Sequence, residues 1–235
     1  MEVKSAERTV RILETLAASP TRLTLSQLQE RMGYPRSSLH ALVRTLRDLK
    51  WLEADETGSA FGVGPHALLS GTAYLDRDPA LPFAYEAMED LRSETGYTVH
   101  YARRDEGNVL YLASRDTRDH AIPRVGRKLP ADTTALGLAL LAQLTADEVA
   151  QLRPDAPHTS LETIRNRGWS FEREQSRPGV ACVAATVDYR IPATDAISCA
   201  LPADRATDEE VDRIATAVTR AASRLATTLR RNGIR

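Results

Sequence analysis

Residues 24–49 hold two short helical patterns separated by a Gly-Tyr-Pro break, and this stretch limits the fold more than any other. Thr24 and Gln27 have the spacing of a capping box, which predicts that a helix starts there. Gly33 permits the positive φ that ends a helix, and Pro35 favours the beginning of the next one. The stretch therefore predicts a helix-turn-helix.

The second helix of this pair has two distinct faces. Three- and four-residue spacing places apolar residues on one side, namely Leu39, Leu42, Val43, Leu46 and Leu49. The other side carries residues suited to phosphates and base edges, namely Arg36, Ser37, Ser38, His40, Arg44 and Arg47. Because the second helix of such a motif reads the major groove, we expect this side to bind DNA.

The charge of the same stretch supports this interpretation. Residues 22–50 include six basic and two acidic side chains, a local net charge of +4, while the whole chain carries −1. A basic patch on a nearly neutral protein is typical of nucleic-acid contact. Two alternatives stay open, namely a helical hairpin with a merely solvated basic side and an adaptor that binds protein through this helix.

The neighbouring segments complete a winged helix. Residues 3–18 form an amphipathic helix whose inner face is expected to hold Ala6, Val10, Leu13 and Ala17, widened by Ile12 and Leu16. Residues 51–54 and 60–63 are strand candidates joined by the turn-forming run 55–59. We therefore predict a winged helix-turn-helix DNA-binding domain over residues 1–64.

The rest of the chain predicts a linker and a second domain. A helical pattern at residues 65–76 precedes prolines at 79 and 82, which predicts a linker helix and a hinge over residues 65–79. Residues 80–235 alternate helical patterns at 84–94, 133–144, 161–167 and 207–231 with strand patterns at 98–103, 109–113, 180–188 and 196–201. This mixture predicts an α+β domain.

Composition narrows the class of protein. A chain of 235 residues suits two domains, and it has no run of eighteen apolar residues. The first twenty residues are charged and periodic, unlike a secretory signal, and only Cys182 and Cys199 are cysteines. We therefore expect a cytoplasmic protein that does not contact membranes.

Enzyme motifs are absent from the sequence. The five histidines, at 40, 66, 100, 120 and 158, show no metal-ligand spacing, and no nucleophile elbow, phosphate-binding glycine loop or dinucleotide fingerprint occurs. We therefore expect no metal and no cofactor. The competing hypothesis is a small-molecule-binding enzyme, a Cys182-based hydrolase or transferase with His100 as its base and an accessory helical domain.

Four motifs together resemble the IclR family of bacterial transcription regulators over nearly the whole chain. They are P-R-S-S-L-H-A-L-V-R-T-L at 35–46, F-G-V-G at 61–64, G-R-K-L-P-A-D-T-T-A-L-G-L-A-L-L-A at 126–142 and I-R-N-R-G-W-S-F-E-R-E-Q-S-R-P-G-V-A-C-V-A-A at 164–185. The resemblance implies a winged helix, a C-terminal GAF-like effector-binding domain, and dimers that pair into tetramers. Lys50, Asp132 and Thr186 depart from the family pattern, so the identity of the effector transfers less readily than the fold.

Residues 129–137 predict a loop that enters a helix. Free N–H groups and the dipole at such a helix start favour an anion, unless Asp132, Thr133 or Thr134 caps the helix internally. The resemblance implies that the Ala135 and Leu136 amides bind a ligand carboxylate.

Three more residues are implied as pocket residues by the resemblance, namely Glu172, Cys182 and Ser198. Each has an alternative interpretation: a surface acid, a small buried apolar residue and a strand hydroxyl, respectively. The expected effector is a small organic acid, or a related polar compound, with an apolar or aromatic body.

The expected partners follow from these interpretations. A homodimer or homotetramer would place two recognition helices, the second helix of each helix-turn-helix, in successive major grooves of a pseudo-palindromic double-stranded operator. A small organic effector would bind two arrangements of the DNA-binding domains with different affinity, and it would favour the arrangement that it binds more tightly. Whether the outcome is repression or activation stays open.

Overall fold

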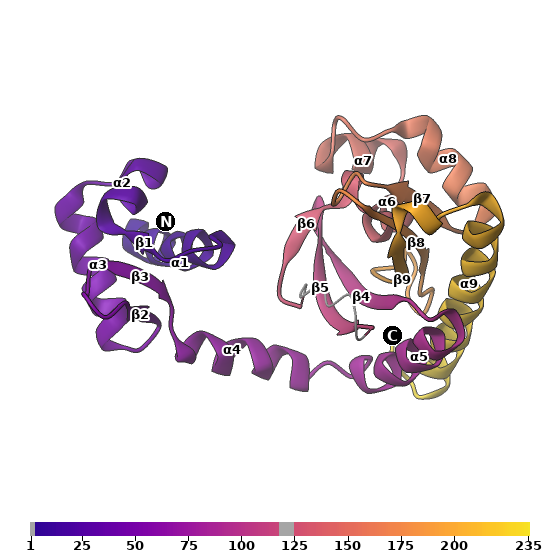
Figure 1. The fold of residues 1–235 in the computed structure, drawn as a ribbon, viewed down its shortest axis with the longest axis horizontal. Helices are drawn as coiled ribbons and strands as arrows, with labels where there is room; N and C mark the ends of the chain where they lie inside the picture. Colours follow the sequence, from indigo (N-terminus) through magenta and orange to yellow (C-terminus); the bar gives the residue numbers. More distant parts are fainter. Residues whose placement is uncertain (1–2, 118–124) are drawn as a thin grey trace. The chain divides into compact units, whose positions relative to one another are not determined.

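The structure, a computed structural model, describes residues 3–117 and 125–235 (Figure 1). Its contacts divide the chain into two compact units, Met1–Arg77 and Asp78–Arg235. In the described ranges, no helix is both long enough and apolar enough to cross a membrane. Each unit combines helices with an antiparallel sheet, so the predicted α+β class is confirmed.

The first unit is the predicted winged helix-turn-helix. In chain order it contains α1 (Lys4–Ala18), β1 (Leu23–Thr24), α2 (Leu25–Met32), α3 (Arg36–Asp48), β2 (Leu52–Ala54), β3 (Ala60–Val63) and α4 (Pro65–Asp76). The strands form an antiparallel sheet in the order β1-β3-β2. The sequence pattern does not predict β1, because two residues are too few to show alternation.

Local signals place α2 and α3 as expected. The capping box is present, since the Gln27 N–H donates to Thr24 Oγ1 at 3.2 Å and the Thr24 N–H donates to Gln27 Oε1 at 2.8 Å. Gly33 ends α2 with φ +67°. The predicted apolar face of α3 is one residue too long, because Leu49 lies beyond the helix end and is 57% exposed.

The predicted inner face of α1 is confirmed in part and wrong in part. Ile12 and Leu16 are the buried residues of this helix, while Val10 is 54% exposed. Ala6 and Ala17 are also exposed, and Leu13 is half-buried. The helix is rotated toward its larger side chains, which bury more apolar area in the core of the unit than alanines would.

The turn between β2 and β3 is closed by its own side chains. Asp55 Oδ1 accepts hydrogen bonds from the backbone N–H groups of Ser59 at 2.8 Å and Ala60 at 3.1 Å. The bond from Ala60, foremost among these, lowers the pKa of Asp55. Gly58 supplies the positive φ that the turn needs. The wing is therefore a defined hairpin.

Helix α4 has the predicted bounds, and the residue after its C-cap belongs to the second unit. No residue of α4 is buried within the unit, and Leu68 and Leu69 are 68% and 64% exposed. Asp78, predicted to lie in a hinge, is buried and accepts a hydrogen bond from Arg103 Nη1 at 2.5 Å. The ion pair with Arg103 therefore holds Asp78 in the core of the second unit, directly after the C-cap of α4.

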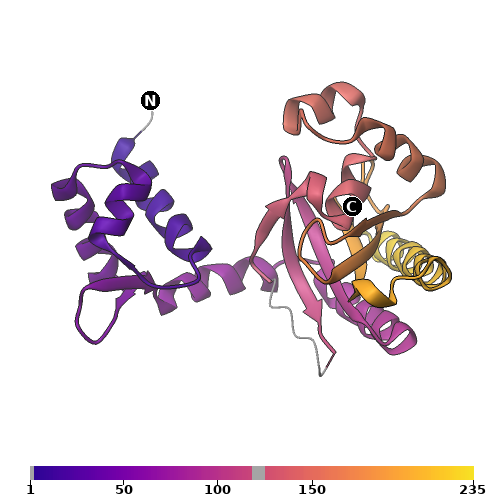
Figure 2. The same ribbon diagram turned by 45° about the horizontal axis from the view of Figure 1, so that its top comes forward.

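The second unit is built on a six-stranded antiparallel sheet in the order β6-β5-β4-β9-β8-β7 (Figure 2). Its strands are β4 (Thr98–Asp105), β5 (Asn108–Arg115), β6 (Lys128–Pro130), β7 (Ser170–Arg173), β8 (Val180–Thr186) and β9 (Asp195–Pro202). Its helices are α5 (Leu81–Thr95), the 3-10 turn η1 (Ala131–Thr133), α6 (Ala135–Leu141), α7 (Ala146–Leu152), α8 (His158–Arg167), the 3-10 turn η2 (Ala203–Arg205) and α9 (Asp208–Arg231).

Helices cover both faces of this sheet. Cys199 of β9 contacts Thr95 of α5 at 3.4 Å, which places α5 against one face, and α9 packs against α5 and β8. Alternate residues point to the opposite face, where Ala102, Ala184 and Ala196 join the buried cluster of α6. The sheet therefore has an α5/α9 face and an α6 face.

Helix α6 is shorter than the predicted 133–144 helix. Thr134 is its N-cap, because the Gly137 N–H donates to Thr134 Oγ1 at 3.1 Å. A Cβ on Gly137 would lie 2.2 Å from the Cα of Ala131, so only glycine fits there. Ser170 Oγ donates to the Ala135 carbonyl at 2.6 Å and ties the helix to β7. Of the three caps considered, Thr134 is the one that the structure selects.

Candidate functional sites

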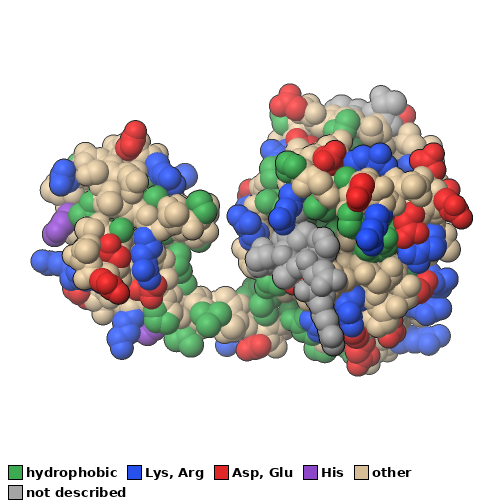
Figure 3. Space-filling model, viewed as in Figure 1, with side chains coloured by type: hydrophobic (Ala, Val, Ile, Leu, Met, Phe, Trp, Pro, Cys, Tyr) green, Lys and Arg blue, Asp and Glu red, His purple; other side chains and the backbone are tan. Residues whose placement is uncertain are grey.

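The outward face of α3 carries the residues predicted to bind DNA. Arg36, Ser37, His40, Arg44 and Arg47 are exposed, while Leu39, Val43 and Leu46 on the opposite side are buried in the core. Figure 3 shows Lys and Arg side chains spread over the surface of this unit. The packing of α3 therefore leaves its cationic side accessible to a nucleic acid.

The wing extends this face. A 230 Å³ groove is lined by His40, Arg44 and Arg47 of α3 together with Gly58 of the wing turn and Phe61 of β3. Arg47 is only loosely paired, since its Nη2 lies 3.7 Å from the Asp48 carboxylate and both side chains are about half exposed. A phosphate backbone beside α3 would therefore meet these cations without displacing a strong internal ion pair.

Ser38 is the exception among the six DNA-face residues. It is half-buried, and Arg8 Nη1 of α1 donates to its Oγ at 3.3 Å. The Arg8 guanidinium also lies over the Tyr34 ring, 5.0 Å from its centroid. Arg8 therefore adds a cation beside the start of α3. The sequence pattern did not single it out, because only the fold brings α1 next to this position.

The α6 face of the sheet collects most of the residues predicted to bind an effector. Glu172 of β7 is the register partner of Cys182 on β8, and Cys182 is the partner of Ala200 on β9. Ser198 lies two residues earlier on β9, so its side chain points to the same face. Residues from three separate segments thus share one surface.

Glu172 has bonding partners of its own. It is 2% exposed, and its carboxylate accepts hydrogen bonds from the Gln175 N–H at 2.9 Å, the Ser176 N–H at 3.4 Å and the Ser176 hydroxyl at 2.8 Å. It is therefore not a surface acid. These bonds stabilise the turn between β7 and β8 and also satisfy much of its acceptor capacity.

Ala135 and Leu136 lie deep in the same region. Their side chains are 1% and 2% exposed and belong to the buried cluster around α6. Since Thr134 already caps this short helix, part of the donor capacity at its start is used internally.

The Cys182–His100 pairing proposed for an enzyme is wrong. His100 of β4 pairs with Ser198, and Cys182 pairs with Ala200, so strand β9 lies between the two residues. Two strand spacings place their backbones roughly 10 Å apart, so the two residues are not neighbours in the sheet. In residues 3–117 and 125–235, no group of His, Cys, Asp and Glu is arranged to hold a metal ion. His120 lies outside these ranges.

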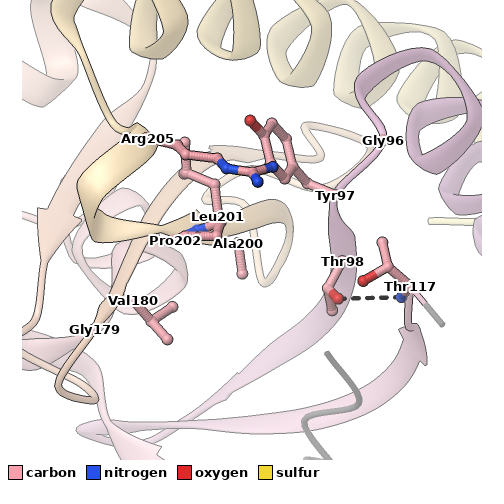
Figure 4. A pocket seen from close by; sticks show the side chains of 10 residues that line it. All are labelled: Gly96, Tyr97, Thr98, Thr117, Gly179, Val180, Ala200, Leu201, Pro202 and Arg205. Carbon is pink, nitrogen blue, oxygen red and sulfur yellow. Dashed lines mark hydrogen bonds between the residues drawn. The ribbon is translucent and has the colours of Figure 1, made fainter. Parts of the chain in front are cut away.

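A cavity of about 210 Å³ lies at one end of the sheet (Figure 4). Its lining comes from the starts of β4 and β8, the ends of β5 and β9, and η2, namely Gly96, Tyr97, Thr98, Thr117, Gly179, Val180, Ala200, Leu201, Pro202 and Arg205. Thr98 and Ala200 are register partners, so the cavity continues the row that contains Glu172 and Cys182. The sequence motifs pointed to neither Tyr97 nor Arg205.

A winged helix with an exposed cationic reader helix, followed by a separate sheet domain with a cavity, defines a ligand-responsive DNA-binding regulator. The family model "IclR helix-turn-helix domain" matches residues 5–56, and "Bacterial transcriptional regulator IclR C-terminal" matches residues 72–227. The chain therefore belongs to the IclR family of transcription regulators, with an N-terminal domain that binds DNA and a C-terminal domain that binds an effector. This is a family of regulators and not of enzymes, as the absence of enzyme motifs predicted.

Individual relatives agree with this assignment. The chain is 28% identical over 255 residues to the Escherichia coli protein named "Transcriptional repressor IclR", covering 100% of this chain and 92% of that one. Its fold is similar to an IclR regulator from Alicyclobacillus acidocaldarius, with a TM-score of 0.82, 20% identity and coverage of 97% and 99% of the two chains. It is also similar to an IclR homologue from Microbacterium hydrocarbonoxydans complexed with 4-hydroxybenzoate, with a TM-score of 0.76, 21% identity and coverage of 96% and 99%.

Proposed function

We propose that α3 enters the major groove of an operator and that the wing lies along the adjacent backbone. The residues that contact base edges or nearby phosphates are Arg36, Ser37, Ser38 and His40. Arg44 and Arg47 contact the DNA backbone and so position α3 in the groove. The observation that carries this proposal is the exposed cationic side of α3 on a helix whose other side is buried in the core. The side chains suit the roles, since arginine binds guanine edges or phosphates and serine accepts or donates at either.

Two copies of the chain would bind a pseudo-palindromic operator, as a homodimer or as part of a homotetramer. Each winged helix would take one half-site, because the symmetry of such an operator mirrors that of the protein. We propose domain limits of 1–64 for the winged helix, 65–79 for the linker and hinge, and 80–235 for the effector domain. The protein would bind its operator in the cytoplasm, where that DNA lies.

We also propose that the effector is a small organic acid, or a related polar compound, with an apolar or aromatic body. It would bind at the α6 face near Ala135, Leu136, Glu172, Cys182 and Ser198. The bound 4-hydroxybenzoate in the Microbacterium homologue supports an aromatic acid. Several relatives carry the name of a repressor, so we propose that the effector releases the operator. It can do so only to the extent that it binds the two arrangements with different affinity.

Binding to the upstream DNA of its own gene tests the regulator function. The affinity should fall steeply with salt, because each neutralised phosphate releases counterions. Replacing Arg36, Arg44 and Arg47 together by alanine should weaken binding at all sequences and reduce the salt slope by about 3. Replacing Arg224, an exposed arginine of α9, serves as the matched control. Unchanged operator affinity in the triple variant would show that the assigned face is wrong.

A further inference from the structure

The cavity at the end of the sheet has walls of two kinds. Val180, Ala200 and Pro202 provide apolar surface, and Thr98 and Tyr97 provide hydroxyl groups. Arg205 lines the same cavity and is exposed, so the cavity opens to solvent at a cationic side chain. Figure 4 shows the Arg205 side chain reaching from η2 toward Tyr97. The lining therefore suits a molecule that has an apolar body and one negative end.

The positive charge of Arg205 is not used by a neighbouring acid. In the part of the chain that the structure describes, no ion pair involves this side chain. The nearby carboxylate of Glu210 is held by Arg213 through two hydrogen bonds of 2.7 and 2.8 Å, and it also interacts with the Tyr97 hydroxyl. These bonds, with that from Arg213 foremost, hold the pKa of Glu210 at about 2. Glu210 therefore has partners of its own, and Arg205 stays available to an anion.

The segment that carries Arg205 is fixed in place. The Ala203 N–H donates to the Gly179 carbonyl at 3.0 Å, which joins η2 to the turn before β8. Arg173 of β7 donates to the Ala206 carbonyl on the other side of η2. β7 and the turn before β8 thus anchor η2, and the Arg205 side chain starts from a defined backbone position at the cavity edge.

The carboxylate end of the proposed effector is better placed in this cavity than at the start of α6. Ala135 is 1% exposed, and Thr134 already accepts from the Gly137 amide. A carboxylate placed there would lose most of its hydration without meeting a full positive charge. At the cavity it would meet the planar guanidinium of Arg205, which binds carboxylates by two parallel hydrogen bonds.

We infer that this cavity binds a small monocarboxylate through Arg205, with the apolar body of the ligand against Val180, Ala200 and Pro202. A volume of about 210 Å³ is below the roughly 300–1,000 Å³ of pockets for drug-sized ligands, so the acid is small. The inference rests on the proposed function only in naming this ligand as the effector. It assigns the charged end of the effector to a residue outside the family motifs found in the sequence.

Isothermal titration of the full chain tests the inference. The probes are benzoate, 4-hydroxybenzoate, phenylacetate and 3-methylbutanoate, each compared with its neutral amide. At least one acid should bind, and its amide should bind about tenfold more weakly or worse. Arg205→Gln should weaken that acid by about tenfold to a hundredfold, the range for a hydrogen bond to a charged group. Arg205→Lys should restore part of the loss, because it keeps the charge but not the fork.

The control is Arg224→Gln, which removes the same charge from an exposed position of α9 outside the cavity lining. It should bind the acid like the unmodified protein. The inference is overturned if no acid in the panel binds, if the amides bind equally well, or if Arg205→Gln leaves the affinity unchanged. Equal losses in Arg205→Gln and Arg224→Gln overturn it too. Since none of these measurements uses DNA, failure of operator binding would reject the regulator function and leave this result standing.

Discussion

Asp195 is the most consequential buried charge in the second unit. It is 0% exposed and accepts five side-chain hydrogen bonds, from Arg103 Nε at 2.7 Å and Nη2 at 2.8 Å, from the Tyr101 and Tyr189 hydroxyls at 2.6 Å each, and from the Thr194 hydroxyl at 3.2 Å. Arg103 also binds the buried Asp78. Asp195 and Arg103 therefore join β9, β4 and Asp78 in one network.

Asp195→Asn should destabilise this unit by about 3–5 kcal/mol, the cost of breaking a buried ion pair by removing one partner. The asparagine keeps the size of the side chain but leaves Arg103 with an amide in place of a bidentate carboxylate. For a domain of this size, such a loss corresponds to a melting temperature lower by roughly 6–20 °C.

Urea unfolding of the full chain measures this effect. Fluorescence of Trp169 reports the second unit, and the variant Trp51→Phe removes the signal of the first. Tyr189→Phe, which removes a single hydrogen bond, should cost only about 1 kcal/mol. Asp204→Asn, at an exposed carboxylate, should cost close to nothing. A loss below about 1 kcal/mol in Asp195→Asn would refute the argument that this pair sustains the unit.

The pH dependence provides a second check. Burial raises the pKa of Asp195. The hydrogen bonds and charge of Arg103 lower this pKa by more than burial raises it, so the net pKa is below the usual value. A lowered pKa means that the carboxylate stabilises the fold fully above the unfolded pKa of about 3.9, and that this contribution is lost as the pH falls toward the folded pKa. The difference between the unmodified protein and Asp195→Asn should therefore be constant near pH 7 and shrink below about pH 4. Growth of the difference in acid would contradict the assignment.

Three further predictions concern single positions. Lys50 has φ +61°, so Lys50→Gly should raise the free energy of unfolding of the first unit by up to about 1 kcal/mol, whereas Lys50→Ala, which keeps the strain, should not. Gly137→Ala should cost more than about 3 kcal/mol in a urea titration, because its Cβ would overlap the backbone of Ala131; a loss below 1 kcal/mol would show that the loop yields easily. Burial raises the pKa of Cys199 to about 12, so at pH 8 iodoacetamide should label Cys182 first. The variant Cys182→Ser should therefore lose the fast phase of labelling. Fast labelling in that variant would place Cys199 at the surface.

Local chemistry explains which parts of the fold could be predicted. Thr24, Gly33 and Pro35 each act within a few residues, so the capping box, the turn and the start of α3 are confirmed as predicted. Helix α4 likewise has its predicted bounds. Short edge strands were missed, because β1 and β6 have two and three residues and their pairing partners are distant. The inner face of α1 was wrong at Ala6, Val10 and Ala17, since more than one apolar stripe fits a helical period and only packing chooses between them.

The candidate sites divide in the same way. The DNA face could be predicted because it is one side of one helix, where sequence spacing sets which residues lie together. The cavity could not, because Tyr97, Val180 and Arg205 are far apart in the chain and meet only where β4 and β8 begin and η2 ends. Arg8 is missing from the predicted face for the same reason.

By itself, the sequence determined the helix-turn-helix, the basic side of its second helix and the family to which the chain belongs, since each depends on short-range order along the chain. Tertiary structure alone decided which carboxylates are neutralised by a cation and which cations form no ion pair. Arg103 and Asp195 are 92 residues apart in sequence yet share two hydrogen bonds, while Arg205 forms no ion pair in the part of the chain that the structure describes. The physical reason is that a charge pair depends on distance in space and on burial, and strand register sets both.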